Sequence, residues 1–121
     1  MKVLLTGCNG LVGRAIREVA DPNDFQFVLA SRDNYELTDQ RVVEQAFNNE
    51  WKGVDAVIHA AASVGGIKLN LDAPVKQYRD NILINTFVTD AAFRYGVKKF
   101  IAFSSVCAFP AEAKLLNGDN L

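Results

Sequence analysis

The fold is decided at the start of the chain, in the stretch MKVLLTGCNGLVG (Met1–Gly13). The apolar run Val3–Leu5 predicts a short buried strand, and the residues from Gly10 onward predict a helix. Between them lie three evenly spaced glycines, Gly7, Gly10 and Gly13. In a strand–turn–helix unit such glycines permit a tight turn, let the backbone approach a pyrophosphate and let the helix pack closely on the strand. The stretch therefore predicts a dinucleotide site at the start of the helix; the alternative is a turn that needs its glycines for geometry alone.

The composition narrows the class of protein. Half of the 121 residues are hydrophobic, enough for one domain with a core. The net charge of −1 argues against a nucleic-acid surface or an anionic membrane surface as partner. Cys8 and Cys107 lie far apart without the spacing of metal ligands, which predicts a reducing compartment and no metal site. No signal peptide and no apolar stretch of membrane-spanning length is recognised, so we expect a cytoplasmic protein.

Strand-like and helix-like segments alternate along the chain. The expected strands are 2–5, 25–30, 54–59 and 100–104, with Leu37 compatible with a further short strand, and the expected helices are 11–20, about 39–49 and 74–95. Residues 60–71 are expected to form a loop. This alternation predicts an α/β fold with a Rossmann-type, doubly wound parallel sheet, here truncated.

Ligands of such sheets bind at the carboxyl ends of the strands, so the residues that follow each strand are candidate site residues. Arg32 follows the second strand and suits the 2′-phosphate of NADP, whereas an Asp33 turned to the ribose would favour NAD. The alternative for Arg32 is a solvated surface charge. The small residues Ala60–Ala62 let a cofactor lie close to the end of their strand. His59, the only histidine, ends an alternating apolar strand and is interpreted as a packed residue rather than a catalytic one.

Further motifs extend the pattern over nearly the whole chain. They are Thr6-Gly7-x-x-Gly10-Leu11-Val12-Gly13, Leu37-Thr38-Asp39, Val57-Ile58-His59-Ala60-Ala61-Ala62-x-Val64-Gly65-Gly66, Tyr78-Arg79-Asp80-Asn81-Ile82-x-Ile84-Asn85, Gly96-Val97-Lys98-Lys99 and Ser105-Val106-Cys107-Ala108-Phe109-Pro110. Together they resemble the extended short-chain dehydrogenase/reductase family, and within it the epimerase–reductases that act on GDP-4-keto-6-deoxy-mannose. The first motif is shared by the whole superfamily, and the motifs at Val64 and Ser105 are much narrower.

The resemblance implies NADP(H) as the cofactor, with NAD as the alternative, and a nucleotide sugar as the substrate. Taken with the strand ends, it gives as cofactor-binding residues Gly7, Asn9, Gly10, Leu11, Val12, Gly13, Arg32, Leu37, Ala60, Ala61 and Ala62, and as substrate-binding residues Val64, Gly65 and Gly66. The family tends to dimerise through its long helices, so a homodimer is expected.

The resemblance also implies catalytic roles. Ser105 matches the serine that hydrogen-bonds the carbonyl oxygen of the sugar, and Cys107 matches the cysteine that acts as acid or base in the epimerisation. A polarised carbonyl acidifies the neighbouring C–H groups, which a thiol can then exchange. The alternative for Cys107 is a small buried hydrophobic residue. Asn81 matches an asparagine that supports the hydrogen bonds of the active site.

One motif of the family is not matched. The family uses a Tyr-x-x-x-Lys pair on the helix after the serine strand, but Tyr95-x-x-x-Lys99 precedes Ser105 and is interrupted by Gly96. We therefore expect residues 1–121 to be the N-terminal part of an NAD(P)-binding domain, without the substrate domain and with little or no reductase activity alone.

Two other functions stay open from the sequence. One is a different extended family member, such as a nucleotide-sugar 4-epimerase or dehydratase, against which Cys107 and the motif at Val64 argue. The other is a non-catalytic NADP-binding module, favoured by the unmatched catalytic pair and opposed by Ser105 and Cys107.

Overall fold

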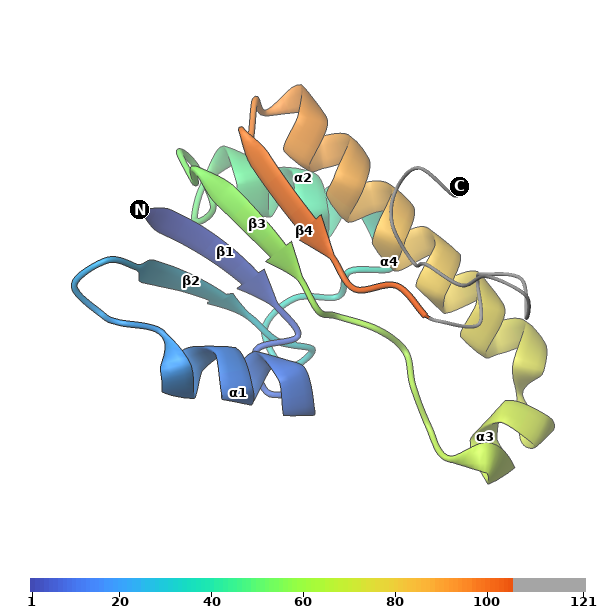
Figure 1. The fold of residues 1–121 in the computed structure, drawn as a ribbon. Coiled ribbons are helices and arrows are strands. Elements are labelled where there is room, and N and C mark those ends of the chain that lie inside the picture. Colours follow the sequence, from blue (N-terminus) through green and yellow to red (C-terminus); the bar gives the residue numbers. More distant parts are fainter. Residues whose placement is uncertain (106–121) are drawn as a thin grey trace, which may run out of the picture.

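A four-stranded parallel sheet forms the centre of the structure, a computed structural model that describes residues 1–105 except for the side chains of residues 69 and 70 (Figure 1). The elements are, in chain order, β1 (Lys2–Thr6), α1 (Leu11–Val19), β2 (Gln26–Ala30), α2 (Gln40–Asn48), β3 (Ala56–His59), α3 (Ile67–Asp72), α4 (Pro74–Arg94) and β4 (Lys99–Ala102). This arrangement confirms the predicted α/β fold with a parallel sheet.

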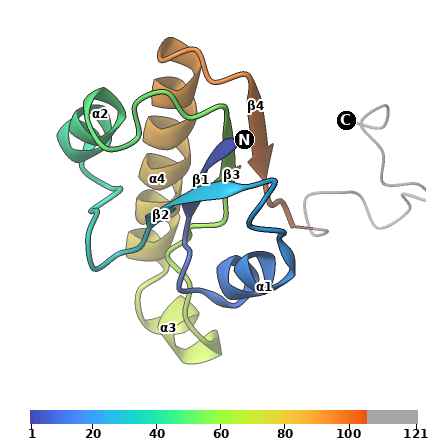
Figure 2. The same cartoon turned by 90° about the vertical axis from the view of Figure 1, so that its left-hand side faces the viewer.

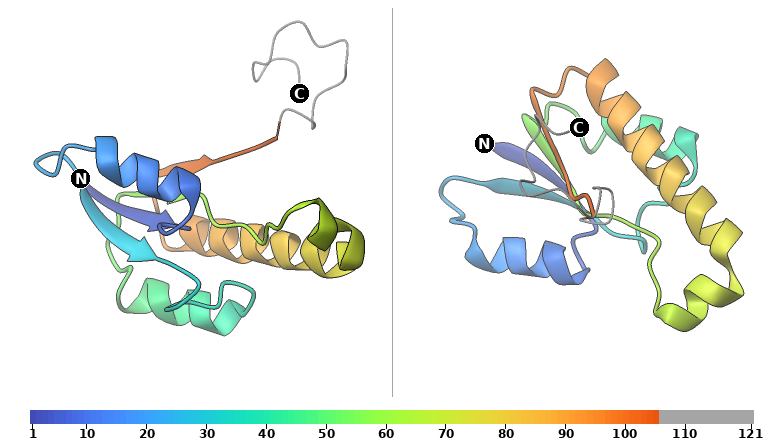
Figure 3. Two further views of the ribbon diagram at one scale, coloured as in Figure 1. Left: turned by 90° about the horizontal axis from the view of Figure 1, so that it is seen from below. Right: turned by 45° about the vertical axis from the view of Figure 1, so that its right-hand side comes forward.

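The order of the strands changes direction at β1. The sheet runs β2-β1-β3-β4, so the chain passes from β1 to one side for β2 and to the other side for β3 and β4. Helix α1 covers one face of the sheet, and α2 and α4 cover the other (Figure 3). In a doubly wound sheet, ligands bind beyond the carboxyl ends of the strands at such a reversal, which here lies between β1 and β3.

The main core lies between the sheet and the two helices α2 and α4. Leu4 of β1, Val57 of β3 and Val88 of α4 are fully buried in one apolar cluster. Trp51 is also fully buried, and its ring packs edge-on against Phe47 with 5.2 Å between the centroids. Burying a large apolar side chain contributes about 1.5–3 kcal/mol. The cluster therefore holds β1 and β3 firmly against α4 and fixes the edge at which they end.

The long helix has the boundaries that the sequence predicts. Pro74 is its first residue, and Gly96 follows its end with φ +73°, a left-handed conformation that glycine adopts easily. Figure 2 shows α4 running along the strands, with α3 beyond the carboxyl end of the sheet. None of the helices within residues 1–105 is long and apolar enough to cross a bilayer.

Two expectations about local structure were wrong. Leu37 lies in a turn between β2 and α2, not on a strand; its side chain is buried in the main core, so its apolar character reflects packing. Residues 60–71 were expected to be a loop throughout, but Ile67–Asp72 form helix α3. That segment contains neither Gly nor Pro, and its Lys68–Asp72 ion pair (2.6 Å) has the i,i+4 spacing that stabilises a helical turn.

Candidate functional site

The glycine turn after β1 has the close contacts that its spacing predicts. Gly7 has φ +68°, and a methyl group there would lie 2.5 Å from the carbonyl oxygen of Ala60. At Gly13 a methyl group would lie 2.3 Å from the carbonyl oxygen of Gly7, so α1 packs directly on the turn. The N–H of Gly10 donates to the carbonyl oxygen of Gly7 at 2.9 Å and closes the turn. A side chain at either Gly7 or Gly13 would therefore force the backbone apart.

The start of α1 is suited to an anion. Gly10 is its N-cap and contributes no side-chain hydrogen bond, and the first turn contains no acidic residue. The first N–H groups of a helix have no partner within the helix, and the helix dipole places partial positive charge there. A phosphate group is one of the anions that such an end binds.

A cleft of about 800 Å³ opens at this end of the sheet. That volume lies within the range of about 300–1,000 Å³ typical of small-molecule sites. Of the residues predicted from the sequence, the cleft is lined by Gly7, Asn9, Gly10, Leu11, Val12, Arg32, Leu37, Ala60, Ala61, Ala62 and Val64. Gly13 lies behind the turn, while Gly65, Gly66, Asn81 and Ser105 do not line the cleft. The structure thus brings together residues that follow three different strands.

A buried hydrogen-bonded chain fixes the wall formed by the residues after β3. The Oδ1 atom of Asn85 accepts from Nε2 of His59 (3.0 Å), so Nδ1 of His59 accepts from the hydroxyl of Thr6 (2.7 Å). The N–H of Ala61 in turn donates to the Thr6 hydroxyl oxygen at 3.2 Å. Burial lowers the pKa of His59, which keeps the ring neutral. His59 therefore packs between the strands and α4, as interpreted from the sequence, and does not line the cleft.

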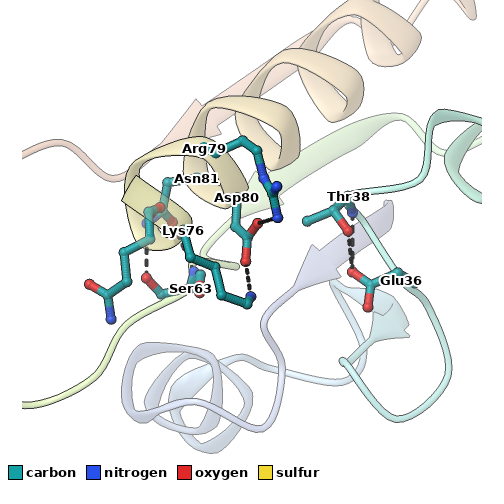
Figure 4. Close-up of polar contacts among 8 residues, drawn as sticks. Glu36, Thr38, Ser63, Lys76, Arg79, Asp80 and Asn81 are labelled. Carbon is teal, nitrogen blue, oxygen red and sulfur yellow. Dashed lines mark hydrogen bonds and ion pairs between the residues drawn. The ribbon is translucent and has the colours of Figure 1, made fainter. Parts of the chain in front are cut away.

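Asn81 holds the same wall from α4. Its Oδ1 atom accepts from the N–H of Ser63 (2.8 Å), and its Nδ2 atom donates to the carbonyl oxygens of Ser63 (2.8 Å) and Gln77 (2.9 Å) (Figure 4). The side chain thus pairs with the backbone of Ser63 much as a neighbouring strand would. Asn81 acts on the cleft through Ser63, and its part in catalysis stays a prediction.

The predicted catalytic residues are not tested by this geometry. Ser105 is exposed and follows β4, at the carboxyl edge of the sheet, and Cys107 lies outside the described residues. The Tyr95-x-x-x-Lys99 match is at the opposite edge: Tyr95 follows α4 and donates to Glu44 at 3.2 Å, and Lys99 begins β4. Within residues 1–105 no cluster of three or more His, Cys, Asp or Glu residues is placed to hold a metal ion.

Sequence reasoning missed several polar residues of the cleft. These are Glu36 and Thr38 on the turn before α2, and Lys76, Arg79 and Asp80 on the first turns of α4 (Figure 4). The Thr38 hydroxyl donates to Glu36 at 2.7 Å. The signal for the second group was the three charged residues within two turns of the helix-starting proline, but their place at the cleft depends on how α4 crosses the sheet.

Comparison with known proteins gives a family and a set of relatives. The model of the NAD dependent epimerase/dehydratase family matches residues 3–120. GDP-L-fucose synthase of Escherichia coli (strain K12) is 35% identical, with 97% of this chain and 38% of that protein covered. Probable GDP-L-fucose synthase of Drosophila melanogaster is 37% identical, with 90% and 34% covered.

Solved structures agree with these relatives. A GDP-L-fucose synthetase from Naegleria fowleri bound to NADP superposes with a TM-score of 0.74 at 29% identity, covering 94% of this chain and 33% of that one. A GDP-mannoheptose C4 reductase from Campylobacter jejuni with NADP bound gives a TM-score of 0.81 at 27% identity, covering 93% and 35%. The chain therefore spans about a third of the length of the relatives it matches.

Proposed function

Because the chain belongs to the NAD dependent epimerase/dehydratase family, we propose that it is the N-terminal, cofactor-binding part of a nucleotide-sugar epimerase/reductase. The observation that carries this proposal is the cleft at the β1/β3 reversal, which joins the glycine turn, the start of α1 and the small residues Ala60–Ala62. The substrate domain of the relatives would lie in the part of their length that this chain does not cover.

The proposed cofactor is NADP(H), which supplies a hydride when it is bound. Relatives of known structure contain NADP, and the residues present here fit it. The N–H groups at the start of α1 would hold the diphosphate, Ala60–Ala62 would leave room for the rest of the dinucleotide, and Arg32 would pair with the 2′-phosphate. Asp33 also lines the cleft, but it accepts a hydrogen bond from the Asn9 amide at 3.4 Å.

The proposed substrate is a GDP-linked 4-keto sugar, with GDP-4-keto-6-deoxy-mannose converted to GDP-fucose. The names of the relatives support this substrate class. The Ser105 hydroxyl would donate a hydrogen bond to the carbonyl oxygen and thereby acidify the neighbouring C–H groups. Cys107 would remove or return a proton at those carbons during epimerisation.

The long helix supports a proposal about assembly. Val75, Tyr78, Ile82 and Phe93 of α4 are exposed, at 78%, 72%, 48% and 83%. An apolar stripe of this kind marks an interaction surface in a water-soluble domain. We propose that two copies of the chain pair through α4 to form a homodimer, which analytical ultracentrifugation of the wild type and of Tyr78→Lys would test.

Calorimetric titration of the protein with NADP⁺ and with NAD⁺ tests the proposed function. We expect saturable binding of one dinucleotide per chain, with NADP⁺ bound more tightly. We expect the 121-residue protein with NADPH and the keto sugar to show little or no turnover, because the Tyr-x-x-x-Lys pair is not at the cleft of the described residues. A folded protein that binds neither dinucleotide would rule the proposal out.

A further inference from the structure

Three charged side chains from the first turns of α4 form one ion-paired group on the cleft wall (Figure 4). The ammonium group of Lys76 bonds Oδ2 of Asp80, and the guanidinium of Arg79 lies 3.2 Å from Oδ1. The Asp80 side chain is only 9% exposed, whereas those of Lys76 and Arg79 are 66% and 65% exposed. The carboxylate is thus hidden while both cations reach the solvent of the cleft.

The charges of this group do not cancel. Burying a carboxylate requires a partner, and either cation alone would supply one. Two cations on one carboxylate leave a surplus positive charge at the surface of the cleft. Lys76 has three N–H donors and Arg79 has five, and each uses one on Asp80. The remaining donors are available to an oxyanion, and their direction is already fixed by the ion pairs.

The rest of the cleft, which also contains the carboxylates of Asp33 and Glu36, has two further features that suit an anion. The first turn of α1 presents free N–H groups and contains no acidic residue of its own, and Arg32 stands after β2. All three positive features line one cleft at the end of the sheet. A ligand with more than one phosphate group would meet all of them together, and preorganised donors bind it with less loss of side-chain freedom.

We propose that Lys76 and Arg79, held in place by Asp80, bind a phosphate group of the dinucleotide from the α4 side of the cleft. This inference rests on the proposed cofactor site. It adds to that site a second, independent anion-binding surface, formed by Lys76 and Arg79. The phosphate is either one of the diphosphate, which NAD⁺ and NADP⁺ share, or the 2′-phosphate, which only NADP⁺ carries. Comparing the two dinucleotides therefore tells these two sources apart.

The competing explanation is that the two cations serve only to neutralise Asp80. Their loss would then change stability without changing the affinity of the folded protein. The chain contains a matched control, because Lys68 and Asp72 on α3 form an ion pair with the same i,i+4 spacing but do not line the cleft. The variants Lys76→Met and Arg79→Met each leave Asp80 one cationic partner, which preserves the fold, and Lys68→Met removes a lysine outside the cleft.

The experiment measures the dissociation constants of NADP⁺, NAD⁺ and 2′,5′-ADP for the wild type and the three variants by calorimetry, with circular dichroism as the check of folding. We expect Lys76→Met and Arg79→Met each to weaken binding about three- to tenfold, since the cations are partly solvated, and Lys68→Met to leave it unchanged. Lys76→Arg should retain binding. Raising the salt concentration from about 0.02 M to about 0.5 M should reduce the difference in dissociation constant between the wild type and each methionine variant at the cleft.

The pattern across ligands identifies the phosphate. An equal loss for NAD⁺ and NADP⁺ assigns the wall to the diphosphate, and a loss confined to NADP⁺ and 2′,5′-ADP assigns it to the 2′-phosphate. Variants that fold and bind all three ligands as tightly as Lys68→Met does would overturn the inference and leave the proposed function standing. A wild type that binds none of them would overturn both.

Discussion

Nδ1 of His59 lies 2.7 Å from the hydroxyl oxygen of Thr6, in the buried layer between the ends of β1 and β3 and helix α4. The two residues are also paired in register in the sheet. The Thr6 hydroxyl oxygen also accepts from the N–H of Ala61, which lies in the cleft wall. The position of that wall therefore depends on a neutral His59, whose Nδ1 accepts from the same hydroxyl. This dependence gives a first prediction.

The stability of the protein should fall as the pH drops below the ordinary histidine pKa of 6.5, because burial lowers the pKa of His59 in the folded state. The unfolded chain then takes up a proton that the folded protein does not, so acid favours unfolding, and the stabilisation is complete only above that pKa. Urea denaturation between about pH 5 and pH 8 measures this effect. His59→Gln removes the titrating group and should flatten that part of the plot of unfolding free energy against pH. Equal slopes for the wild type and the variant would show that His59 does not cause the pH dependence.

Gly7→Ala should destabilise the protein strongly. The methyl group would meet the carbonyl oxygen of Ala60 at 2.5 Å, and the φ of +68° is unfavourable for alanine. Gly53→Ala is the matched control, because Gly53 has φ +72° with nothing within 4 Å of the added methyl group. We expect about 1 kcal/mol of destabilisation for the control and about 2 kcal/mol more for Gly7→Ala, from thermal or urea unfolding. Equal losses of stability in the two variants would mean that the backbone at Ala60 can move away from the glycine turn.

Arg32→Ala should weaken the binding of NADP⁺ much more than that of NAD⁺. A charge-assisted hydrogen bond to a phosphate contributes about 1.5–3 kcal/mol, so the affinity for NADP⁺ should fall about ten- to a hundredfold while that for NAD⁺ stays nearly unchanged. Arg17→Ala, in the last turn of α1 and outside the cleft, serves as control. If Arg32→Ala weakened both dinucleotides equally, Arg32 would not be recognising the 2′-phosphate.

Asn81→Asp should loosen the wall without changing its shape. The variant keeps an oxygen beside the N–H of Ser63 but loses the donor to the carbonyl oxygens of Ser63 and Gln77. We expect a loss of about 1–3 kcal/mol in stability. Because those two carbonyl oxygens repel a carboxylate, the Ser63 amide should also exchange with solvent faster, which hydrogen-exchange NMR resolves directly. Unchanged exchange at Ser63 would show that contacts other than Asn81 hold this segment.

The sequence predicted the parts of the site that depend on local backbone geometry. The spacing of Gly7, Gly10 and Gly13 is read within one strand–turn–helix unit, and the structure shows the contacts that this spacing requires. The alternation of elements likewise predicted the sheet, because parallel strands need crossover connections. Leu37 was misassigned since a buried apolar residue in a turn has the same local signal as one on a strand.

The residues on the α4 side of the cleft could not be found in this way. Arg79 and Asp80 belong to a motif of the resemblance, but no local pattern places them or Lys76 in a cofactor cleft. Only the packing of α4 across β3 and β1 brings these side chains to the same cleft as the glycine turn. Asn81 was named from the sequence only through the resemblance to a family, and its bond to Ser63 joins residues 18 apart in the chain. Such contacts depend on tertiary packing, which no local pattern encodes.

The measurement that decides most directly whether the cleft is a dinucleotide site is an NMR titration of the ¹⁵N-labelled protein with NADP⁺. We predict saturable shifts of the amide signals of Gly10, Leu11, Val12 and Ala61, which line the cleft, with Gly53 at the other end of the sheet unaffected. A folded protein whose cleft amides do not shift, or whose shifts gather around Gly53, would contradict the assignment.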